Sequence, residues 1–169
     1  AERLLNDPRM RRFLDDFSSQ WLRLDKLSNI GVDRERYPSY DQDLALLSIR
    51  ETLDYVADVY SNGASALDLI DSNYAILNDR LAEHYGIAND FAGDLRKVAL
   101  TEDSLRGGLL TQASVLTMNS DGVDSHPIRR GVWLLERILN QPPPPPPPNV
   151  PDIDQNDPDF RGLSLKEQI

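Results

Sequence analysis

The sequence has 169 residues, of which 40% are apolar, with 18 Lys and Arg against 28 Asp and Glu and a formal net charge of −10. This acidic balance argues against non-specific nucleic-acid binding, which needs an excess of positive charge to neutralise phosphates. The absence of Cys excludes disulfides, thiolate chemistry, zinc–thiolate sites and covalent attachment of haem through a C-x-x-C-H motif within this chain. The sequence has no run of about 18 apolar residues, so it contains no predicted membrane span.

The first predicted helix runs from Pro8 to about Leu27. Asp7 is its expected N-cap, and Pro8 suits the first helical position because its missing amide hydrogen has no partner there. Apolar residues then recur at three- and four-residue steps, which predicts one buried stripe along the helix. The stripe consists of Met10, Phe13, Phe17, Trp21 and Leu24.

A second helix is predicted after Pro38, with Ser39 and Gln42 forming a capping box and Asn62-Gly63 ending it. Its apolar positions are spaced like the core positions of a heptad. These positions are Leu46, Ile49, Leu53, Val56 and Tyr60.

A short helical turn at residues 65–70 precedes a third predicted helix. The cluster at residues 71–73 is its expected cap, Gly86 its expected end, and its apolar face consists of Tyr74, Leu77, Leu81 and Tyr85. Three amphipathic helices of this kind can bury one shared core, so we expect an antiparallel bundle.

The periodicity fades over residues 87–102, where residues 96–100 fit either a short strand or an extended connector. A short helix rich in small residues is then predicted at 109–116, followed by a loop at 119–122. Pro127 is expected to begin the last helix, whose apolar face would be Ile128, Val132, Leu135 and Leu139.

Seven consecutive prolines, Pro142 to Pro148, favour an extended polyproline II segment, because each ring fixes φ and removes a backbone donor. Such a segment can be a ligand for an aromatic-lined groove or a rigid spacer of roughly 20 Å, and we favour the spacer. The acidic remainder is expected to be extended. Arm and tail together would wrap a partner through Pro142, Pro145, Pro148, Val150 and Phe160.

These elements predict a mainly α fold: an antiparallel helical bundle with a short second helical unit, a polyproline arm and an extended acidic tail. The predicted division is a bundle at 1–103, a second helical unit packed on it at 104–141, the arm at 142–151 and the tail at 152–169.

Several composite motifs resemble planctomycete-type cytochrome c-associated proteins, which are large exported proteins built from consecutive domains of unknown function. The later part of the chain resembles one domain of these proteins, and the motifs that carry this resemblance are R-G-G-L-L-T-Q-A-S-V-L-T (106–117), S-H-P-I-R-R-G-V-W-L-L-E-R-I-L (125–139), the proline run and Asn149-Val150-Pro151. The earlier part resembles the domain that precedes it there, through the motifs Phe17-x-x-x-Trp21-Leu22, Tyr37-Pro38-x-Tyr40-Asp41, Glu51-Thr52 and Asn78-x-x-Leu81-Ala82-x-His84-Tyr85-Gly86. At His126 the chain departs from the family, where Ser or Thr is more usual, which puts in doubt a family-wide role for that position.

The resemblance implies a periplasmic or otherwise exported location. In such proteins a segment like 163–169 is followed by a His-rich stretch and a C-x-x-C-H haem motif, so the resemblance implies haem c in a neighbouring segment or in a partner, with no cofactor in this chain. It supplies no reaction, and no residue is predicted as catalytic.

His84 is the first candidate for a cofactor contact, as a distal haem ligand or a docking contact; the alternative is a histidine that interacts with the last carbonyls of its helix. Arg129 and Arg130 are candidates for gripping a carboxylate or haem propionate, the alternative being exposed helix-face charges. The same two alternatives hold for Arg11-Arg12. Asp124-Ser125-His126 is interpreted as a helix start, because adjacent residues do not line up as a catalytic triad.

The acidic tail alternates oxygen-bearing side chains at Asp152, Asp154 and Asp157, which makes these the candidates for calcium binding. Counted from Asp152, the sixth and twelfth positions are Asp157 and Leu163, where a helix–loop–helix calcium site needs Gly and Glu. That motif therefore fails, leaving a looser calcium site or a solvated acidic tail.

We expect a non-enzymatic scaffold or interaction module, an accessory subunit that holds or docks a c-type cytochrome or a membrane-associated redox complex in an electron-transfer assembly. The alternative is part of a haem-dependent oxidoreductase whose haem lies in a C-terminal region outside this chain, with His84, Arg129 and Arg130 lining the site.

Overall fold

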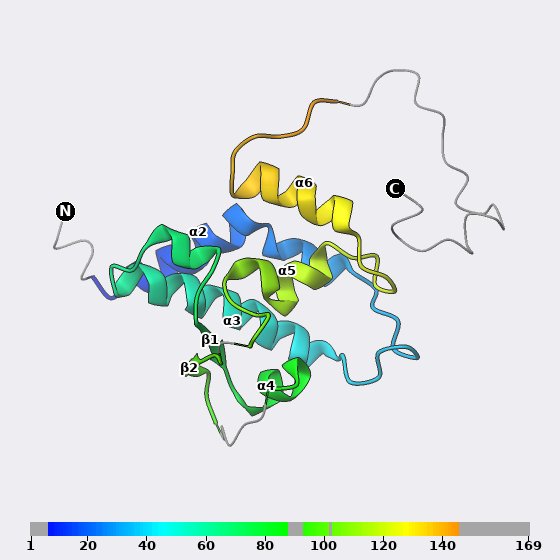
Figure 1. The fold of residues 1–169 in the computed structure, drawn as a ribbon, viewed down its shortest axis with the longest axis horizontal. Helices are drawn as coiled ribbons and strands as arrows, with labels where there is room; N and C mark the ends of the chain where they lie inside the picture. The colour runs from blue at the N-terminus through cyan, green and yellow to red at the C-terminus, as the bar shows by residue number, and fades with distance from the viewer. Residues whose placement is uncertain (1–6, 88–92, 102, 146–169) are drawn as a thin grey trace.

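The structure is a computed structural model that describes residues 7–87, 93–101 and 103–145 (Figure 1). The fold is mainly α, as predicted, with a small two-stranded sheet. Its elements in chain order are α2 Met10–Leu22, η1 Leu24–Asn29, α3 Gln42–Ser61, η2 Ala66–Leu69, β1 Tyr74–Leu77, α4 Asp79–Tyr85, β2 Arg96–Ala99, η3 Leu109–Thr111, α5 Ala113–Met118 and α6 Pro127–Arg137, where η marks a 3-10 helix.

Helix α2 is shorter than predicted at both ends. It begins at Met10, and Asp7 instead accepts a 2.9 Å hydrogen bond from the backbone N–H of Arg9 in a preceding turn. It ends at Leu22 because Arg23 adopts the left-handed conformation, with φ 60°. The chain then continues as the 3-10 helix η1 rather than as α-helix to Leu27.

The predicted buried stripe is wrong at Phe13 and Phe17, because α2 packs on α3 through the neighbouring stripe, whereas Leu24 is buried in the core and Trp21 packs against it as predicted. The buried residues of α2 are Leu14, Ser18 and Leu22. Phe13 and Phe17 are 58% and 49% exposed and stack along the outer face with Trp21 at ring-centroid distances of 6.0 and 5.8 Å. We call these three residues the aromatic face.

Helix α3 is present as predicted but has a different cap, and its predicted face is correct only in part: Val56 is buried, and Ile49 and Leu53 pack against the core. Asp41, not Ser39, is its N-cap and accepts a 2.8 Å hydrogen bond from the backbone N–H of Leu44. Leu46 and Tyr60, both predicted to be core, are exposed. The buried residues are Leu44, Ser48, Glu51, Thr52, Tyr55, Val56, Ala57 and Val59.

The first half of the third predicted helix is a β-strand in the structure. Residues 74–77 form β1, which pairs antiparallel with β2 in the register Tyr74↔Ala99 to Leu77↔Arg96, so the segment at 96–100 is a strand at all but its last residue. The helix starts only at Asp79, because the side chain of Asn78 caps it with a 3.0 Å bond from the N–H of Leu81. Gly86 ends it as predicted, with φ 66°.

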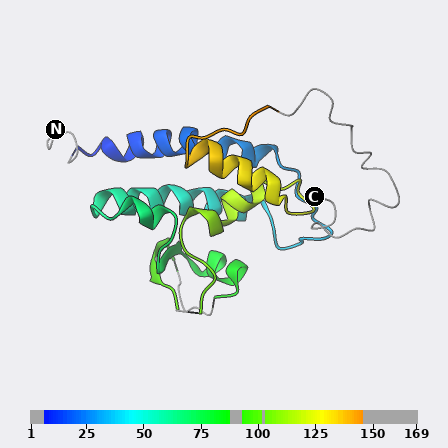
Figure 2. The same ribbon diagram turned by 45° about the horizontal axis from the view of Figure 1, so that its top comes forward.

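The short helix predicted at 109–116 is divided at Gln112, whose extended backbone separates η3 from α5. Helix α6 begins at Pro127 as predicted and lies beside α2 in both ribbon views (Figures 1 and 2). Its predicted face is wrong at both ends, since Ile128 and Leu139 are more than half exposed and Trp133 is the buried residue.

The main core joins both halves of the chain. Its buried members are Leu22, Leu24, Leu27, Tyr55, Val56, Val59, Tyr74, Ile76, Leu109, Val115, Met118 and Trp133. A smaller cluster of Leu44, Leu77, Leu81 and Ala82 holds α4 on α3 and β1. Among the described elements, no helix combines the length and apolar character that a bilayer crossing requires.

Candidate functional site

Motif residues that lie far apart in the sequence meet in a buried polar network between α3, α4 and the segment before η3. Glu51 is 1% exposed, and its Oε2 accepts a 2.5 Å hydrogen bond from the hydroxyl of Tyr85. The same hydroxyl accepts a 2.8 Å bond from the backbone N–H of Ala113, the first residue of α5. Tyr85 therefore links α3, α4 and α5 through one oxygen atom.

The burial of this network sets its charge state. Desolvation raises the pKa of the Glu51 carboxyl to about 8, although the hydrogen bond from Tyr85 and the charge of Arg106 act in the opposite direction. Burial and the neighbouring Glu51 also raise the pKa of the Tyr85 hydroxyl. At neutral pH the pair is therefore an uncharged carboxylic acid and a neutral phenol.

Arg106 closes the network from one side. Its guanidinium lies 3.9 Å from the centroid of the Tyr85 ring and donates a 3.0 Å hydrogen bond to the carbonyl of Thr111. A cation over an aromatic face is attracted by the ring quadrupole. Arg106 therefore stabilises the position of the Tyr85 ring. Among the contacts of the described residues, it forms no direct ion pair with Glu51.

Two glycines bring this segment against its neighbours. Gly107 and Gly108 have φ of 146° and 68°, and a Cβ would lie 2.2 Å from the carbonyl oxygen of Ser72 and of Ile70, respectively. Only glycine combines this backbone with such an approach. The two glycines of the R-G-G motif therefore let residues 106–108 pack closely against residues 70–72, with Arg106 over the Tyr85 ring.

Next to this network, a second buried polar group joins α3 to α5. The hydroxyl of Thr52 lies 2.7 Å from Oε1 of Gln112 and 2.6 Å from the hydroxyl of Ser114. All three residues are buried, so their polar atoms satisfy one another as an enclosed interior requires.

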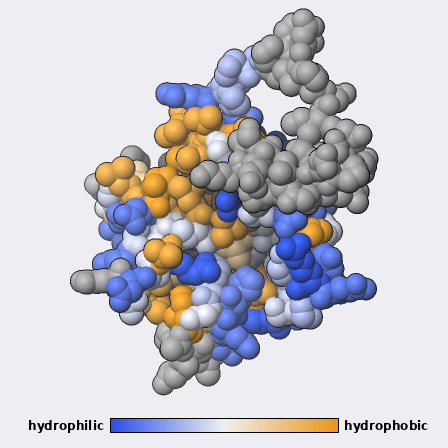
Figure 3. All heavy atoms as spheres, turned by 45° about the vertical axis from the view of Figure 1, so that its right-hand side comes forward, coloured by the Kyte–Doolittle hydropathy of each residue, from blue (hydrophilic) through white to orange (hydrophobic). Residues whose placement is uncertain are grey.

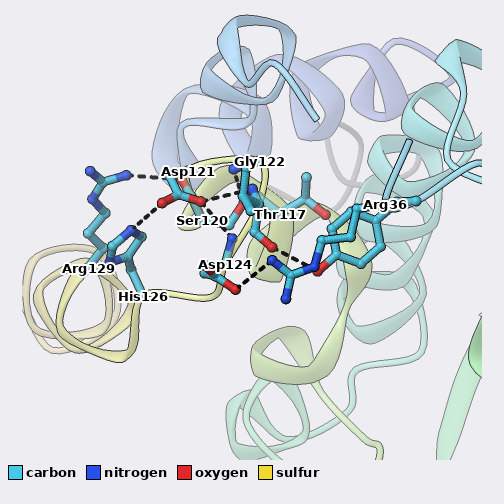
Figure 4. Close-up of polar contacts among 10 residues, drawn as sticks. Arg36, Thr117, Ser120, Asp121, Gly122, Asp124, His126 and Arg129 are labelled. Atoms are coloured by element: carbon cyan, nitrogen blue, oxygen red, sulfur yellow. Dashed lines mark hydrogen bonds and ion pairs between the residues drawn. The ribbon is translucent and has the colours of Figure 1, made fainter. Parts of the chain in front are cut away.

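A separate polar cluster forms the loop between α5 and α6 (Figure 4). The Asp121 carboxylate accepts bonds of 2.9 and 2.7 Å from the backbone N–H groups of Val123 and Asp124 and lies 3.0 Å from Nε2 of His126. Burial opposes ionisation, but these three donors lower the pKa of Asp121 to about 2. Arg36 adds an ion pair to Asp124 at 3.2 Å.

This loop forms one wall of a cavity of about 220 Å³ that also contains His84. The wall is held by the hydroxyl of Tyr37, which donates a 2.8 Å bond to the carbonyl of Val123, and by the carbonyl of Gly122, which accepts a 2.9 Å bond from the N–H of Asp33. Desolvation, with a smaller contribution from Arg106, lowers the pKa of His84. The imidazole is therefore neutral at pH 7, with one ring nitrogen a donor and the other an acceptor.

The structure brings the predicted cofactor-contact residues together only in part. Arg129 donates a 3.1 Å bond to the carbonyl of Ser120, which lines the same cavity as His84, while neither Arg129 nor Arg130 is among the described residues that line it. Arg11 lies in ion pairs with Asp15 and Asp54. The role of these residues toward a cofactor stays a prediction.

The other predicted site residues divide between exposed and undescribed segments. Pro142 and Pro145 are exposed in a segment that is neither helix nor strand. Pro148, Val150 and Phe160 and the calcium candidates Asp152, Asp154 and Asp157 lie outside the described residues. Within the described ranges, no three His, Asp or Glu side chains are grouped to hold a metal ion. Covalent haem attachment needs two Cys, and the sequence has none, so the residues present do not fit a c-type haem.

Two family models match the chain in succession. The first, described as PSD4, a protein of unknown function (DUF1592), matches residues 1–87. The chain belongs to the PSD4 family. The second, described as PSCyt3, a protein of unknown function (DUF1588), matches residues 106–169. The searches of curated proteins and of solved structures gave no match.

These matches confirm the resemblance and locate the polar network. Glu51 and Tyr85 lie in the PSD4 region, whereas Arg106 and Ala113 lie in the PSCyt3 region. The motifs that contain these residues were identified from the sequence, but the contact of Glu51 and Tyr85 with Arg106 and Ala113 was not predicted. The available signal was the polar Glu51-Thr52 pair on α3; it marks a buried polar contact only once the buried face of α3 is known.

Proposed function

We propose that this chain is a non-enzymatic scaffold or interaction module of an exported, periplasmic electron-transfer assembly, in which it holds or docks a c-type cytochrome. The family name PSCyt3 supports an association with cytochromes. The lack of Cys means that the haem belongs to a neighbouring segment or to the partner. The chain would act by positioning, and its own residues carry out no chemical step.

The exposed aromatic face is the observation that carries this proposal. Phe13 and Phe17 are about half exposed and form a continuous stack with Trp21. Trp21 in turn donates a 2.6 Å bond to the carbonyl of Arg137, so α6 lies against one end of the face and leaves the other end open. Figure 3 shows apolar surface gathered near the start of the proline segment, where α6 ends.

A surface of this kind is suited to docking a protein. Aromatic residues dominate the energetically important positions of interfaces, because they bury a large area with few rotatable bonds. The net charge of −10 would further assist the approach of a basic cytochrome at low ionic strength. The aromatic face would provide most of the binding affinity, and the negative charge would increase the rate at which the two proteins meet.

The test is a pull-down of the native protein from membranes under mild detergent, with haem staining, a pyridine haemochrome spectrum and an intact-mass reading. The double variant Phe13→Ser/Phe17→Ser is compared with Leu105→Ser, a control at an apolar residue that is 97% exposed. We expect a c-type cytochrome to accompany the native protein and the control but not the double variant.

Two outcomes would contradict the proposal. Equal capture by the double variant would show that the partner does not use the aromatic face. A mass that includes covalently bound haem would identify the native protein as a cytochrome itself, and the alternative of a haem-dependent oxidoreductase would then take precedence.

A further inference from the structure

The Glu51 carboxyl is enclosed so completely that the closed structure strongly disfavours its ionised form. The residue is 1% exposed, and the adjoining cavity has a volume of only about 10 Å³, which is at the lower limit for a single water molecule. A carboxylate normally needs several donors or an ion pair when it is removed from water. Here its oxygen Oε2 has the hydroxyl of Tyr85.

Besides Glu51 itself, four titratable or charged side chains line the small cavity around this carboxyl, and they come from α3, β1, α4 and the segment before η3. Tyr55 lies on α3, Tyr74 on β1, Tyr85 on α4 and Arg106 on the segment before η3. The three phenols are neutral at physiological pH, since burial raises the pKa of each of them. The positive charge of Arg106 is directed at the Tyr85 ring and the Thr111 carbonyl.

Loss of the Glu51 proton would therefore act on the contacts that hold α5. The Tyr85 hydroxyl connects Glu51 to the N–H of Ala113, and Arg106 occupies the ring face of the same tyrosine. To solvate a carboxylate at Glu51, either water must enter the small cavity, which residues 106–108 and 111–112 line, or Arg106 must leave the Tyr85 ring. Either movement weakens a contact that holds residues 106–118 against α3 and α4.

We propose that Glu51, Tyr85 and Arg106 form a proton-operated latch, which holds residues 106–118 on the PSD4 region while Glu51 is protonated and loosens them when the proton is lost. The latch lies at the junction of the two family regions and does not depend on which partner the chain binds. It makes the docking of the PSCyt3 region on the PSD4 region a function of pH.

The direction of the effect follows from linkage. An open, hydrated Glu51 titrates near its ordinary value of 4.5, and the closed one near 8. Between these values only the closed form holds the proton, so each pH unit favours opening by about tenfold, and the effect levels off above the closed value. The latch is firmest below about pH 5 and loosest above about pH 8.

The test is amide hydrogen exchange of residues 113–118 in the full chain at pH 5 to 9, expressed as the protection of the native protein relative to Glu51→Gln at the same pH. Glutamine keeps an acceptor for the Tyr85 hydroxyl but does not titrate. We expect this ratio to fall by about tenfold per pH unit up to about pH 8. Glu51→Met, which fills the same space, must give the same reference profile and serves if the glutamine variant does not fold.

The matched control is Glu83→Gln, at an exposed carboxylate of α4, which must keep the native pH profile. Parallel profiles of the native protein and Glu51→Gln would overturn the latch. An equal fall in protection for the amides of Leu14–Leu22 would also overturn it, because the proton would then act on global unfolding and not on the docking of residues 106–118.

Discussion

The indole N–H of Trp133 donates a 3.0 Å hydrogen bond to the carbonyl of Leu22, across 111 residues of sequence. Leu22 is the last residue of α2, and the left-handed conformation of Arg23 ends the helix there. The carbonyl is therefore free of a helical partner, and Trp133 supplies one. At 3% exposure, the same side chain fills the core between α2 and α6.

Replacing Trp133 by Phe removes both contributions. The Leu22 carbonyl loses its donor inside the core, and the smaller ring leaves a cavity, so we expect the free energy of unfolding to fall by about 2–4 kcal/mol. Urea denaturation followed by circular dichroism measures this change. Ile128→Ala on the same helix is the control, because its side chain is 58% exposed; a Trp133→Phe effect no larger than the control effect would contradict the packing described.

Two glycines in the PSCyt3 region should respond in opposite ways to alanine. At Gly108 the backbone has φ 68°, and a Cβ would lie 2.2 Å from the carbonyl oxygen of Ile70, so Gly108→Ala should destabilise the protein by about 3 kcal/mol or more. Gly131 lies within α6 with nothing near its Cβ position, so Gly131→Ala should stabilise it by about 0.5–1 kcal/mol.

Thermal denaturation of the two variants and the native chain tests this pair. The expected order of midpoints is Gly131→Ala, native, Gly108→Ala. A Gly108→Ala variant with the native midpoint would mean that residues 106–108 do not approach η2 as closely as described.

The sequence predicts helices well where caps and periodicity agree, and poorly where several faces are apolar enough to be the core. Helix α6 starts at Pro127 and α4 ends at Gly86 as predicted, since these signals are local. Periodicity favoured Phe13 and Phe17 over Leu14 and Ser18 because it weighs apolarity and not fit. The small side chain of Ser18 permits close packing of α2 on α3. Whether a face fits in this way depends on the shape of the partner helix, which periodicity does not take into account.

The candidate site was less predictable than the fold. Burial of Glu51 depends on Tyr85 and Arg106, which lie 34 and 55 positions further along the chain, and no local pattern links the three. Likewise the segment at Tyr74–Leu77 became a strand because β2 pairs with it, a contact that helical spacing cannot reveal. The Asp121 cluster, by contrast, is local and was visible as a loop signal.

Asp121 should make stability depend on pH at the acidic end. Its folded pKa of about 2 lies below its ordinary value of 3.8; the stabilisation is therefore present above about pH 4 and is lost as pH falls through about 2. Because the side chain is 41% exposed, solvent screening limits the contribution to about 1 kcal/mol. The difference in unfolding free energy between the native chain and Asp121→Asn should shrink between pH 6 and pH 2.5, whereas a constant difference would exclude the carboxylate charge as its cause.

The register of α2 is tested by two adjacent residues. Phe13 is 58% exposed and Leu14 6% exposed, so Leu14→Ala should lower the free energy of unfolding by about 2–4 kcal/mol and Phe13→Ala by less than about 1 kcal/mol. The stripe predicted from periodicity gives the reverse order. Urea denaturation of both variants decides between the two faces, and the same Phe13→Ala protein shows whether the aromatic face can be altered without loss of the fold. A large loss of stability at Phe13 would place that ring in the core and remove it from the surface available to a partner.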